Sequence, residues 1–394
     1  MGMDLYSSSP AAQAVWDGAD EHLLAVYGFP IIELVKQIPK QKTIHFSGIK
    51  GQAIRQHYID MTYDTMDKDG NIKTLPLFAD INNRTLKYTF SHPSGLLFAT
   101  QFAQIALVVT EKAAFNNMRS KDLVQPNCTF TGHSLGEYSA LASIADVLPV
   151  LSLVDVMFYH GITMQRAMQR DAHNRSNYAM CAVNPSRISK TFNEVALHEV
   201  VEVIAHRSNV LLEIVNYNVE GSQYVCAGDL LALQSLMNVL NYLKKENIDI
   251  QKTYSVDRVK EMLQEIVDNC IKAARQKQEA DNGYIVLEHG FATIPLPGID
   301  VPFHSRYLWA GVMPFRACKS LQKINSAHLN PNLLVGKYIP NLIAKPFEIS
   351  WEYAQIIYDQ TSSPHLDKVL KNWERDNWTS LKQCQNLAYT VLSL

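Results

Sequence analysis

The sequence feature that most constrains the fold is a short motif, G-x-S-x-G, at residues 132–136. A β-prone run at residues 129–131 precedes it, and Leu135, Tyr138 and Leu141 then recur at helical steps. A strand that passes through a tight glycine-containing turn into a helix presents the serine of that turn in the open. The motif favours an α/β fold and makes Ser134 a candidate nucleophile. The alternative is a glycine-rich turn that contains a serine by chance.

A serine nucleophile needs an oxyanion donor and a base. The first N–H groups of a helix have no partner within the helix, so we expect the N–H of Leu135 to stabilise an oxyanion. A free serine hydroxyl is a poor nucleophile at neutral pH and needs a base. The chain has 13 histidines. His304, which ends an apolar segment after a proline-rich stretch, is the best candidate by position, whereas His133 reads as a structural neighbour within the turn.

Composition excludes several other classes of function. The formal charge is -2, and no long cluster of Lys or Arg occurs, so nucleic acid is not an expected partner. The 6 cysteines lack C-x-x-C or zinc-like spacing, which predicts reduced thiols and no metal site. No apolar run reaches the roughly 18 residues that would span a bilayer, and the first residues lack the pattern of a secretory signal. We expect a cytoplasmic protein that does not bind membranes.

The remaining patterns predict two domains. Helical spacing covers residues 96–118, and Ser152 is expected to cap a second helix that carries His160 and Met164. From about residue 176 the order becomes strand (178–183), helix (187–205), strand (213–215), strand (224–227) and helix (229–245), which is typical of a ferredoxin-like unit. Residues 251–283 are predicted to be a solvated helical excursion. We therefore expect a large α/β domain, 1–175 with 296–394, interrupted by a small domain, 176–295.

At the serine motif the sequence resembles a known family. Residues 132–141, GHSLGEYSAL, resemble the nucleophile motif of malonyl-CoA:acyl-carrier-protein transacylases. The wider chain, to about residue 375, is similar to the malonyl/palmitoyl transferase domain of the fungal fatty acid synthase beta subunit. The supporting stretches are residues 95–115, 176–188, 213–230, 288–308 and 335–349.

The resemblance implies a hydrolase-like large domain with a parallel sheet and an inserted ferredoxin-like small domain. It implies Ser134 as nucleophile and His304 as general base, with the histidine oriented by a backbone carbonyl. Gln104, Asn218 and Phe303 would line the acyl site; a helix-face amide and a turn-forming Asn are the plain alternatives for the first two. The implied partners are acyl-CoA, an acyl carrier protein and other fatty acid synthase domains or subunits. No cofactor is implied, because the coenzyme A thioester is itself the substrate.

Two departures from the family pattern affect these expectations. The family begins with a strand and a G-Q-G loop that completes the oxyanion hole, and this sequence starts just after that point, which predicts a piece of a larger polypeptide or the product of a truncated gene. The arginine that binds the malonyl carboxylate in the family is replaced by His160, which predicts a different acyl preference. Arg166 lies six residues later, roughly 240° around the helix, and is poorly aimed as a substitute.

Three functions fit these residues. The first is acyl transfer from coenzyme A to a carrier protein through an acyl-serine. The second is a serine hydrolase of thioesterase type, which would need a carboxylate between Ser134 and a histidine, and no motif selects one. The third is an inactive assembly fragment of a fatty acid synthase subunit.

Overall fold

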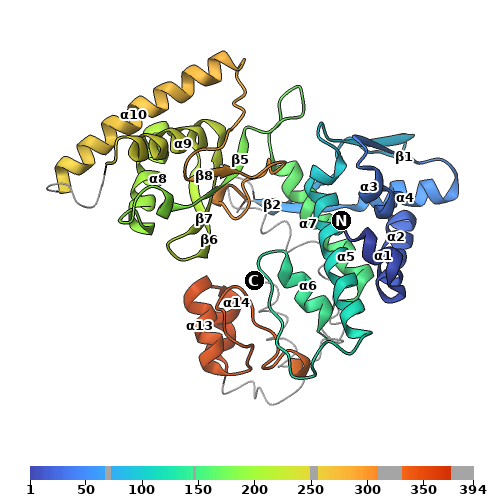
Figure 1. The fold of residues 1–394 in the computed structure, drawn as a ribbon. Coiled ribbons are helices and arrows are strands. Elements are labelled where there is room, and N and C mark those ends of the chain that lie inside the picture. Colours follow the sequence, from blue (N-terminus) through green and yellow to red (C-terminus); the bar gives the residue numbers. More distant parts are fainter. Residues whose placement is uncertain (67–71, 145–147, 249–255, 309–330, 374–394) are drawn as a thin grey trace. The chain divides into compact units, whose positions relative to one another are not determined.

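The computed structural model describes residues 1–66, 72–144, 148–248, 256–308 and 331–373. The chain divides into two compact units: the first unit is Met1–Thr163 with Met313–Leu394, and the second unit is Met164–Val312 (Figure 1). The domain boundaries expected from the sequence, after residues 175 and 295, both lie inside the second unit. No described helix has the length and apolar character needed to cross a membrane.

The first unit is mainly helical. Its core holds large aromatic side chains that are fully buried, such as Tyr27, Phe102 and Phe158. The rings of Tyr27 and Phe158 are 4.4 Å apart between centroids. Its described elements, apart from those that end the chain, are α1 (Met3–Ser8), α2 (Pro10–Val26), α3 (Ile31–Gln37), β1 (Gln41–His45), α4 (Gly48–Asp60), β2 (Thr62–Met66), β3 (Ile72–Pro76), β4 (Lys87–Ser91), η1 (Leu96–Phe98), α5 (Thr100–Arg119), α6 (Gly136–Ser143) and α7 (Val150–Ala167).

Helix α5 confirms the helix expected at residues 96–118, with η1 forming its first part. Helix α6 confirms the helix that follows the G-x-S-x-G motif. The expected cap at Ser152 is wrong, because α7 already begins at Val150 and Ser152 lies within its first turn.

The last described part of the first unit has a small core of its own. It contains η5 (Pro331–Leu333), α13 (Trp351–Thr361) and α14 (Pro364–Lys371). Tyr338, Phe347 and Ile357 are buried there, and Ile144 from the end of α6 packs with them. This core therefore joins the segment around residue 338 to the helix that follows Ser134.

The expected parallel sheet of the large domain appears only as a single bridge among the described residues. Strand β1 pairs with β4 and β2 pairs with β3, both antiparallel. Residues 129–131 form no named strand, but Phe130 makes a parallel bridge with Tyr338. The Phe130 N–H donates to the carbonyl of Lys337 at 2.6 Å, and the Ile339 N–H donates to the carbonyl of Phe130 at 2.9 Å. Among the described residues, Phe130 is the one position of this run that pairs with the segment at Tyr338, so the pairing is a bridge and not a strand ladder.

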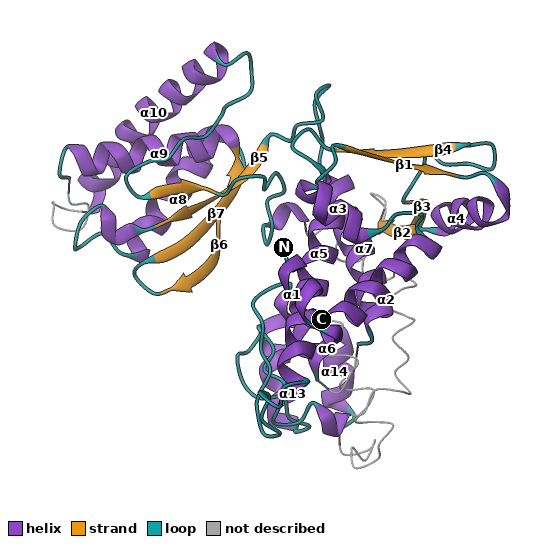
Figure 2. Ribbon diagram, turned by 45° about the vertical axis from the view of Figure 1, so that its right-hand side comes forward, coloured by secondary structure: helices purple, strands orange, loops and turns teal. Residues whose placement is uncertain are grey.

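The second unit is a four-stranded antiparallel sheet with helices on one face (Figure 2). The strands lie in the order β6-β7-β5-β8, so the two central strands come from distant parts of the sequence. The strand, helix, strand, strand, helix order predicted from residue 176 is confirmed. The elements are β5 (Tyr178–Val183), η2 (Pro185–Arg187), α8 (Glu194–Ser208), β6 (Leu212–Val219), β7 (Gln223–Asp229), α9 (Leu230–Lys245), α10 (Val256–Ala280), β8 (Thr293–Pro295) and η3 (Arg306–Leu308).

Helix α10 confirms the expected helical excursion but corrects its description as solvated. Leu263, Val267 and Ile271 are buried in the same core as α8, α9 and the covered face of the sheet. The many charged residues of this segment made its apolar residues, which recur at helical spacing, easy to overlook in the sequence. Through these apolar residues α10 packs as the third helix that covers the sheet.

Candidate functional site

Ser134 lies in a strained turn at the start of α6. Its φ of 54° is in the left-handed region, where a residue with a Cβ costs about 1–2 kcal/mol. Gly132 makes this turn possible, because a Cβ added there would lie 2.1 Å from the carbonyl oxygen of Gly136. A Cβ at Gly136 would meet nothing within 4 Å, so only the first glycine has the steric role that the sequence suggests for both.

The backbone hydrogen bonds of the turn set the Leu135 N–H apart from the N–H groups that follow it. Gly136 donates to the carbonyl of His133 and Glu137 to that of Ser134, each at 3.0 Å, and Tyr138 donates to Leu135 at 3.1 Å. For the Leu135 N–H the described part of the chain offers no acceptor. This is the donor that the sequence predicts for an oxyanion, and an unsatisfied N–H at a helix start attracts negative charge.

Asn341 contacts both sides of Ser134, and sequence reasoning did not single it out. Its Oδ1 accepts the Ser134 N–H at 3.1 Å, and its Nδ2 donates to the carbonyl of Gly132. Glu137 in turn accepts the Asn341 N–H at 2.7 Å and the Tyr338 hydroxyl at 2.8 Å. Asn341 belongs to residues 335–349, which the resemblance already marked as shared with the family. That stretch is the one signal that could have pointed to it.

The structure brings His160 and Gln104 together. His160 Nδ1 lies 2.8 Å from Oε1 of the buried Gln104. The helices that carry them, α7 and α5, approach closely at Gly161, where an added Cβ would lie 2.4 Å from the Cα of Gln101. A larger residue at position 161 would separate the two helices and with them the His160–Gln104 pair.

This pair lies against the helix that begins after the nucleophile. The ring centroids of Tyr138 and His160 are 5.8 Å apart. Tyr138 lies on α6, four residues after Ser134, and burial raises the pKa of the Tyr138 hydroxyl. In the first unit, α6 therefore connects the turn of Ser134 and Leu135, which directly precedes it, to the His160–Gln104 pair, which Tyr138 contacts. Arg166, in the last turn of α7, is exposed.

His304 lies in a turn of the second unit, at a φ of 63°. The sequence places it at the end of an apolar strand-like segment, but the strand ends at Pro295 and the residues after it form turns. Phe303, the residue before it, packs on the uncovered face of the sheet with Met180, Val225 and Ala227. The segment that carries His304 is therefore held by the packing of Phe303 on the sheet, and not by a strand that ends next to His304.

Two ion pairs flank the His304 turn. Before it, Arg170 binds Asp300 through two bonds, Nη1 to Oδ2 at 2.6 Å and Nη2 to Oδ1 at 3.0 Å. After it, Arg306 Nε lies 2.9 Å from Glu213 Oε1, and the Arg306 N–H donates to Oε2 at 3.0 Å. A guanidinium that donates two hydrogen bonds to a carboxylate fixes the relative orientation of the two side chains as well as their separation. The His304 turn is therefore held to β6 through Glu213 and to the loop before β5 through Arg170.

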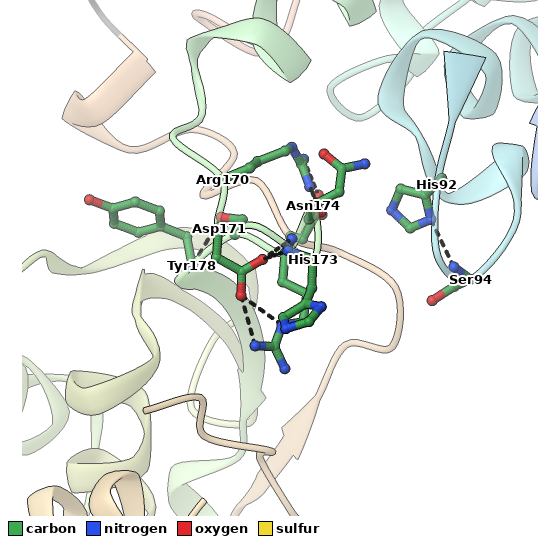
Figure 3. A network of polar contacts seen from close by, with 10 residues as sticks. His92, Ser94, Arg170, Asp171, His173, Asn174 and Tyr178 are labelled. Atoms are coloured by element: carbon green, nitrogen blue, oxygen red, sulfur yellow. Dashed lines mark hydrogen bonds and ion pairs between the residues drawn. The ribbon is translucent and has the colours of Figure 1, made fainter. Parts of the chain in front are cut away.

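That loop is itself rigidly bonded (Figure 3). The Asp171 carboxylate accepts the N–H groups of His173 and Arg175, each at 2.8 Å, and the Nε of Arg175 at 2.8 Å. These bonds, with the Arg175 N–H as the largest cause, lower the pKa of Asp171. Arg170 also donates to the carbonyl of Asn174 at 3.0 Å, so its side chain is aimed by the loop before it reaches Asp300.

Asn218 is not brought to the other candidates. It is exposed in β6, where the pairing with β7 shifts register between Tyr217 and Val219. The structure therefore has it in a strand irregularity and not in a turn. It lies five residues, roughly 16 Å, along the strand from Glu213. In the described ranges its side chain makes no hydrogen bond. Ser134 belongs to the first unit and His304 to the second.

Comparison with known proteins gives the family. A model of the acyl transferase domain matches residues 1–363. The fatty acid synthase subunit beta of Schizosaccharomyces pombe is 52% identical over 377 residues, covering 95% of this chain and 18% of that protein. The subunit of Saccharomyces cerevisiae is 50% identical over 380 residues, with the same two shares, 95% and 18%. This chain thus spans less than a fifth of these relatives.

Among solved structures, FabD from Acinetobacter baumannii matches with a TM-score of 0.50 at 17% sequence identity, covering 91% of this chain and 74% of that one. At this identity the likeness concerns the fold, a mixed arrangement of helices and sheet. The match of the domain model to nearly the whole length of the sequence shows that this chain belongs to the acyl transferase domain family.

Proposed function

We propose that this chain is an acyl-CoA:acyl-carrier-protein S-acyltransferase of fatty acid biosynthesis, of the malonyl/palmitoyl transferase type, and that Ser134 carries the acyl group. The observation that carries the proposal is the turn at Ser134. A strained serine at a helix start, followed by a backbone N–H without a protein acceptor in the described chain, is suited to attack a carbonyl and to hold the resulting oxyanion.

The first half-reaction would load the serine. His304 takes the proton of the Ser134 hydroxyl as Oγ attacks the thioester carbon, and the Leu135 N–H donates to the oxyanion. When the tetrahedral intermediate collapses, the C–S bond breaks and His304 returns the proton to the sulfur of coenzyme A. A well-placed general base contributes about 10²- to 10⁴-fold to such a step.

The second half-reaction would reverse the first with another thiol. A carrier-protein thiol gives its proton to His304 and attacks the acyl-serine, and the serine oxygen recovers the proton as it leaves. Every atom that moves comes from the two thiols, the acyl group, Ser134 and His304, so the reaction as proposed needs no cofactor. Water in place of the thiol would make the chain a hydrolase.

We infer that the first unit takes the place of the hydrolase-like large domain, although its parallel pairing is limited to one bridge in the described chain, and that the second unit is the ferredoxin-like small domain. The sheet order β6-β7-β5-β8, with α8 in one crossover connection and α9 and α10 in the other, supports the second assignment. We infer that other fatty acid synthase domains or subunits are partners, because the relatives that match are fatty acid synthase subunits about five times longer. A place in the cytoplasm accords with that assembly.

The contact of His160 with Gln104 supports an acyl preference away from malonyl groups. In the family that the sequence resembles, an arginine in this position binds the malonyl carboxylate. The imidazole here already uses Nδ1 in its contact with Gln104 and cannot form a two-bond fork. Acetyl, medium-chain and palmitoyl groups carry no carboxylate, so they lose nothing by the exchange.

The test is a partition experiment. The chain is mixed with labelled acetyl- or palmitoyl-CoA and a carrier protein, and label is measured on the carrier thiol and as free acid. Transfer to the carrier at a rate well above hydrolysis supports the proposal. Free acid as the main product would establish the hydrolase, and no turnover of either kind would support an inactive fragment.

A further inference from the structure

The Asn341 side chain joins the two residues on either side of His133. Its Oδ1 accepts the Ser134 N–H at 3.1 Å, and its Nδ2 donates to the Gly132 carbonyl. Asn341 is 207 residues from Ser134 in the sequence, so this is a tertiary contact and not part of the turn itself. An amide is suited to such a bridge because it has both an acceptor and a donor.

The segment that carries Asn341 is fixed next to the turn. Tyr338 makes the parallel bridge with Phe130, only two residues before Gly132. Tyr338 is 3% exposed, and its ring is part of the small core at the end of the first unit. The bridge and the core contacts of Tyr338 therefore fix the segment beside the turn. Asn341 follows Tyr338 by three residues, so its position relative to Ser134 is fixed as well.

Glu137 completes the arrangement from the side of α6. Its N–H donates to the Ser134 carbonyl at 3.0 Å, and its Oε1 accepts the Asn341 N–H at 2.7 Å and the Tyr338 hydroxyl at 2.8 Å. Asn341 is thus held through its backbone by Glu137, while its side chain holds the serine. The three residues Ser134, Glu137 and Asn341 form a closed ring of hydrogen bonds.

A serine with a φ of 54° keeps that conformation only where its surroundings over-determine it. We propose that Asn341 is a positioning residue that holds the Ser134 backbone in its strained conformation, and that Glu137 holds Asn341 in place. This inference rests on the proposed function, in which Ser134 is acylated. With the Ser134 N–H bound by Asn341, the turn keeps both the serine Oγ and the Leu135 N–H aimed at the substrate.

The test measures single-turnover acylation of Ser134 by acetyl-CoA in the whole chain. Asn341→Ala should lower the acylation rate about 10- to 100-fold while the KM for acetyl-CoA changes less than about twofold. Asn341→Asp keeps the acceptor for the serine N–H but loses the donor to the Gly132 carbonyl. Its acylation rate should lie between those of the wild type and Asn341→Ala. The matched control is Asn372→Ala, which removes an amide at the end of α14 that donates to the Lys368 carbonyl and to no other acceptor in the described chain.

Glu137 supplies a second variant pair in case Asn341→Ala folds poorly. Glu137→Gln retains an acceptor oxygen and should keep most of the acylation rate, whereas Glu137→Leu should lose as much as Asn341→Ala. Equal acylation rates for wild type, Asn341→Ala and Glu137→Leu, each counted per folded molecule, would overturn the positioning role and leave the proposed function intact. No acylation of the wild type would overturn both.

Discussion

Replacing His160 with arginine should restore a preference for malonyl groups. His160 Nδ1 lies 2.8 Å from Gln104 Oε1. The neutral imidazole has one donor and one acceptor, so with Nδ1 donating to this oxygen, the second nitrogen can donate to a carboxylate only in the protonated ring. A guanidinium is always charged, and it could donate to Gln104 and still present two further N–H groups to the malonyl carboxylate.

The size of the effect follows from the bonds gained. Leaving one partner of a buried charge pair without the other costs about 2–4 kcal/mol, which corresponds to roughly 30- to 900-fold in kcat/KM. His160 is half-buried, so solvent weakens the pair, and the effect should lie near or below the lower end of this range. We expect His160→Arg to raise the ratio of kcat/KM for malonyl-CoA to that for acetyl-CoA by about 10- to 100-fold.

The assay compares both substrates with the same carrier protein at pH 7, in the wild type, His160→Arg and His160→Gln. The glutamine variant can bond Gln104 but carries no charge, so its malonyl-to-acetyl ratio should stay within about threefold of the wild type. An unchanged ratio in His160→Arg would refute the reasoning, since it would mean that position 160 does not face the acyl carboxylate. An equal rise in the glutamine variant would refute the role of charge.

Three further predictions concern the two catalytic turns. Ser134→Gly should raise the free energy of unfolding in urea by about 0.5–1 kcal/mol, because glycine adopts the left-handed conformation without strain; a less stable variant would contradict the strain. His304→Ala should slow acylation by about 10²- to 10⁴-fold, measured by rapid quench, and an unaffected rate would exclude it as the base. Asp300→Asn should weaken the pair with Arg170 and slow acylation several-fold. Asp171→Asn, in the loop that carries Arg170, leaves that pair in place and should have a smaller effect; equal rates in the wild type and both variants would show that the ion pair does not position His304.

Local patterns were the most predictable part of the fold. Strand β5 has the bounds that its apolar residues predict, and α5, α6 and α9 follow from helical spacing. These elements form from residues close in the sequence. The order strand, helix, strand, strand, helix predicted three strands of the sheet in the second unit, whereas the short edge strand β8 (Thr293–Pro295) was not expected.

Long-range pairing was less predictable. Phe130 meets Tyr338 across 208 positions, and nothing in the run at residues 129–131 tells how far that pairing extends. The same distance explains why Asn341 was missed, since an asparagine after a proline reads as a turn residue. The His160–Gln104 contact could be anticipated only through the family resemblance, because two helix-face residues 56 positions apart carry no shared pattern.

The bond between an acyl group and Ser134 Oγ is the central step of the proposed reaction. Incubating the chain with acetyl-CoA, quenching in acid and sequencing the peptides by mass spectrometry tests it directly. We predict an acetyl group on Ser134, formed within one turnover, and its complete absence in Ser134→Ala at unchanged circular dichroism. An acetyl group on any other residue, or a Ser134→Ala variant that still becomes acetylated, would contradict the assignment of the nucleophile.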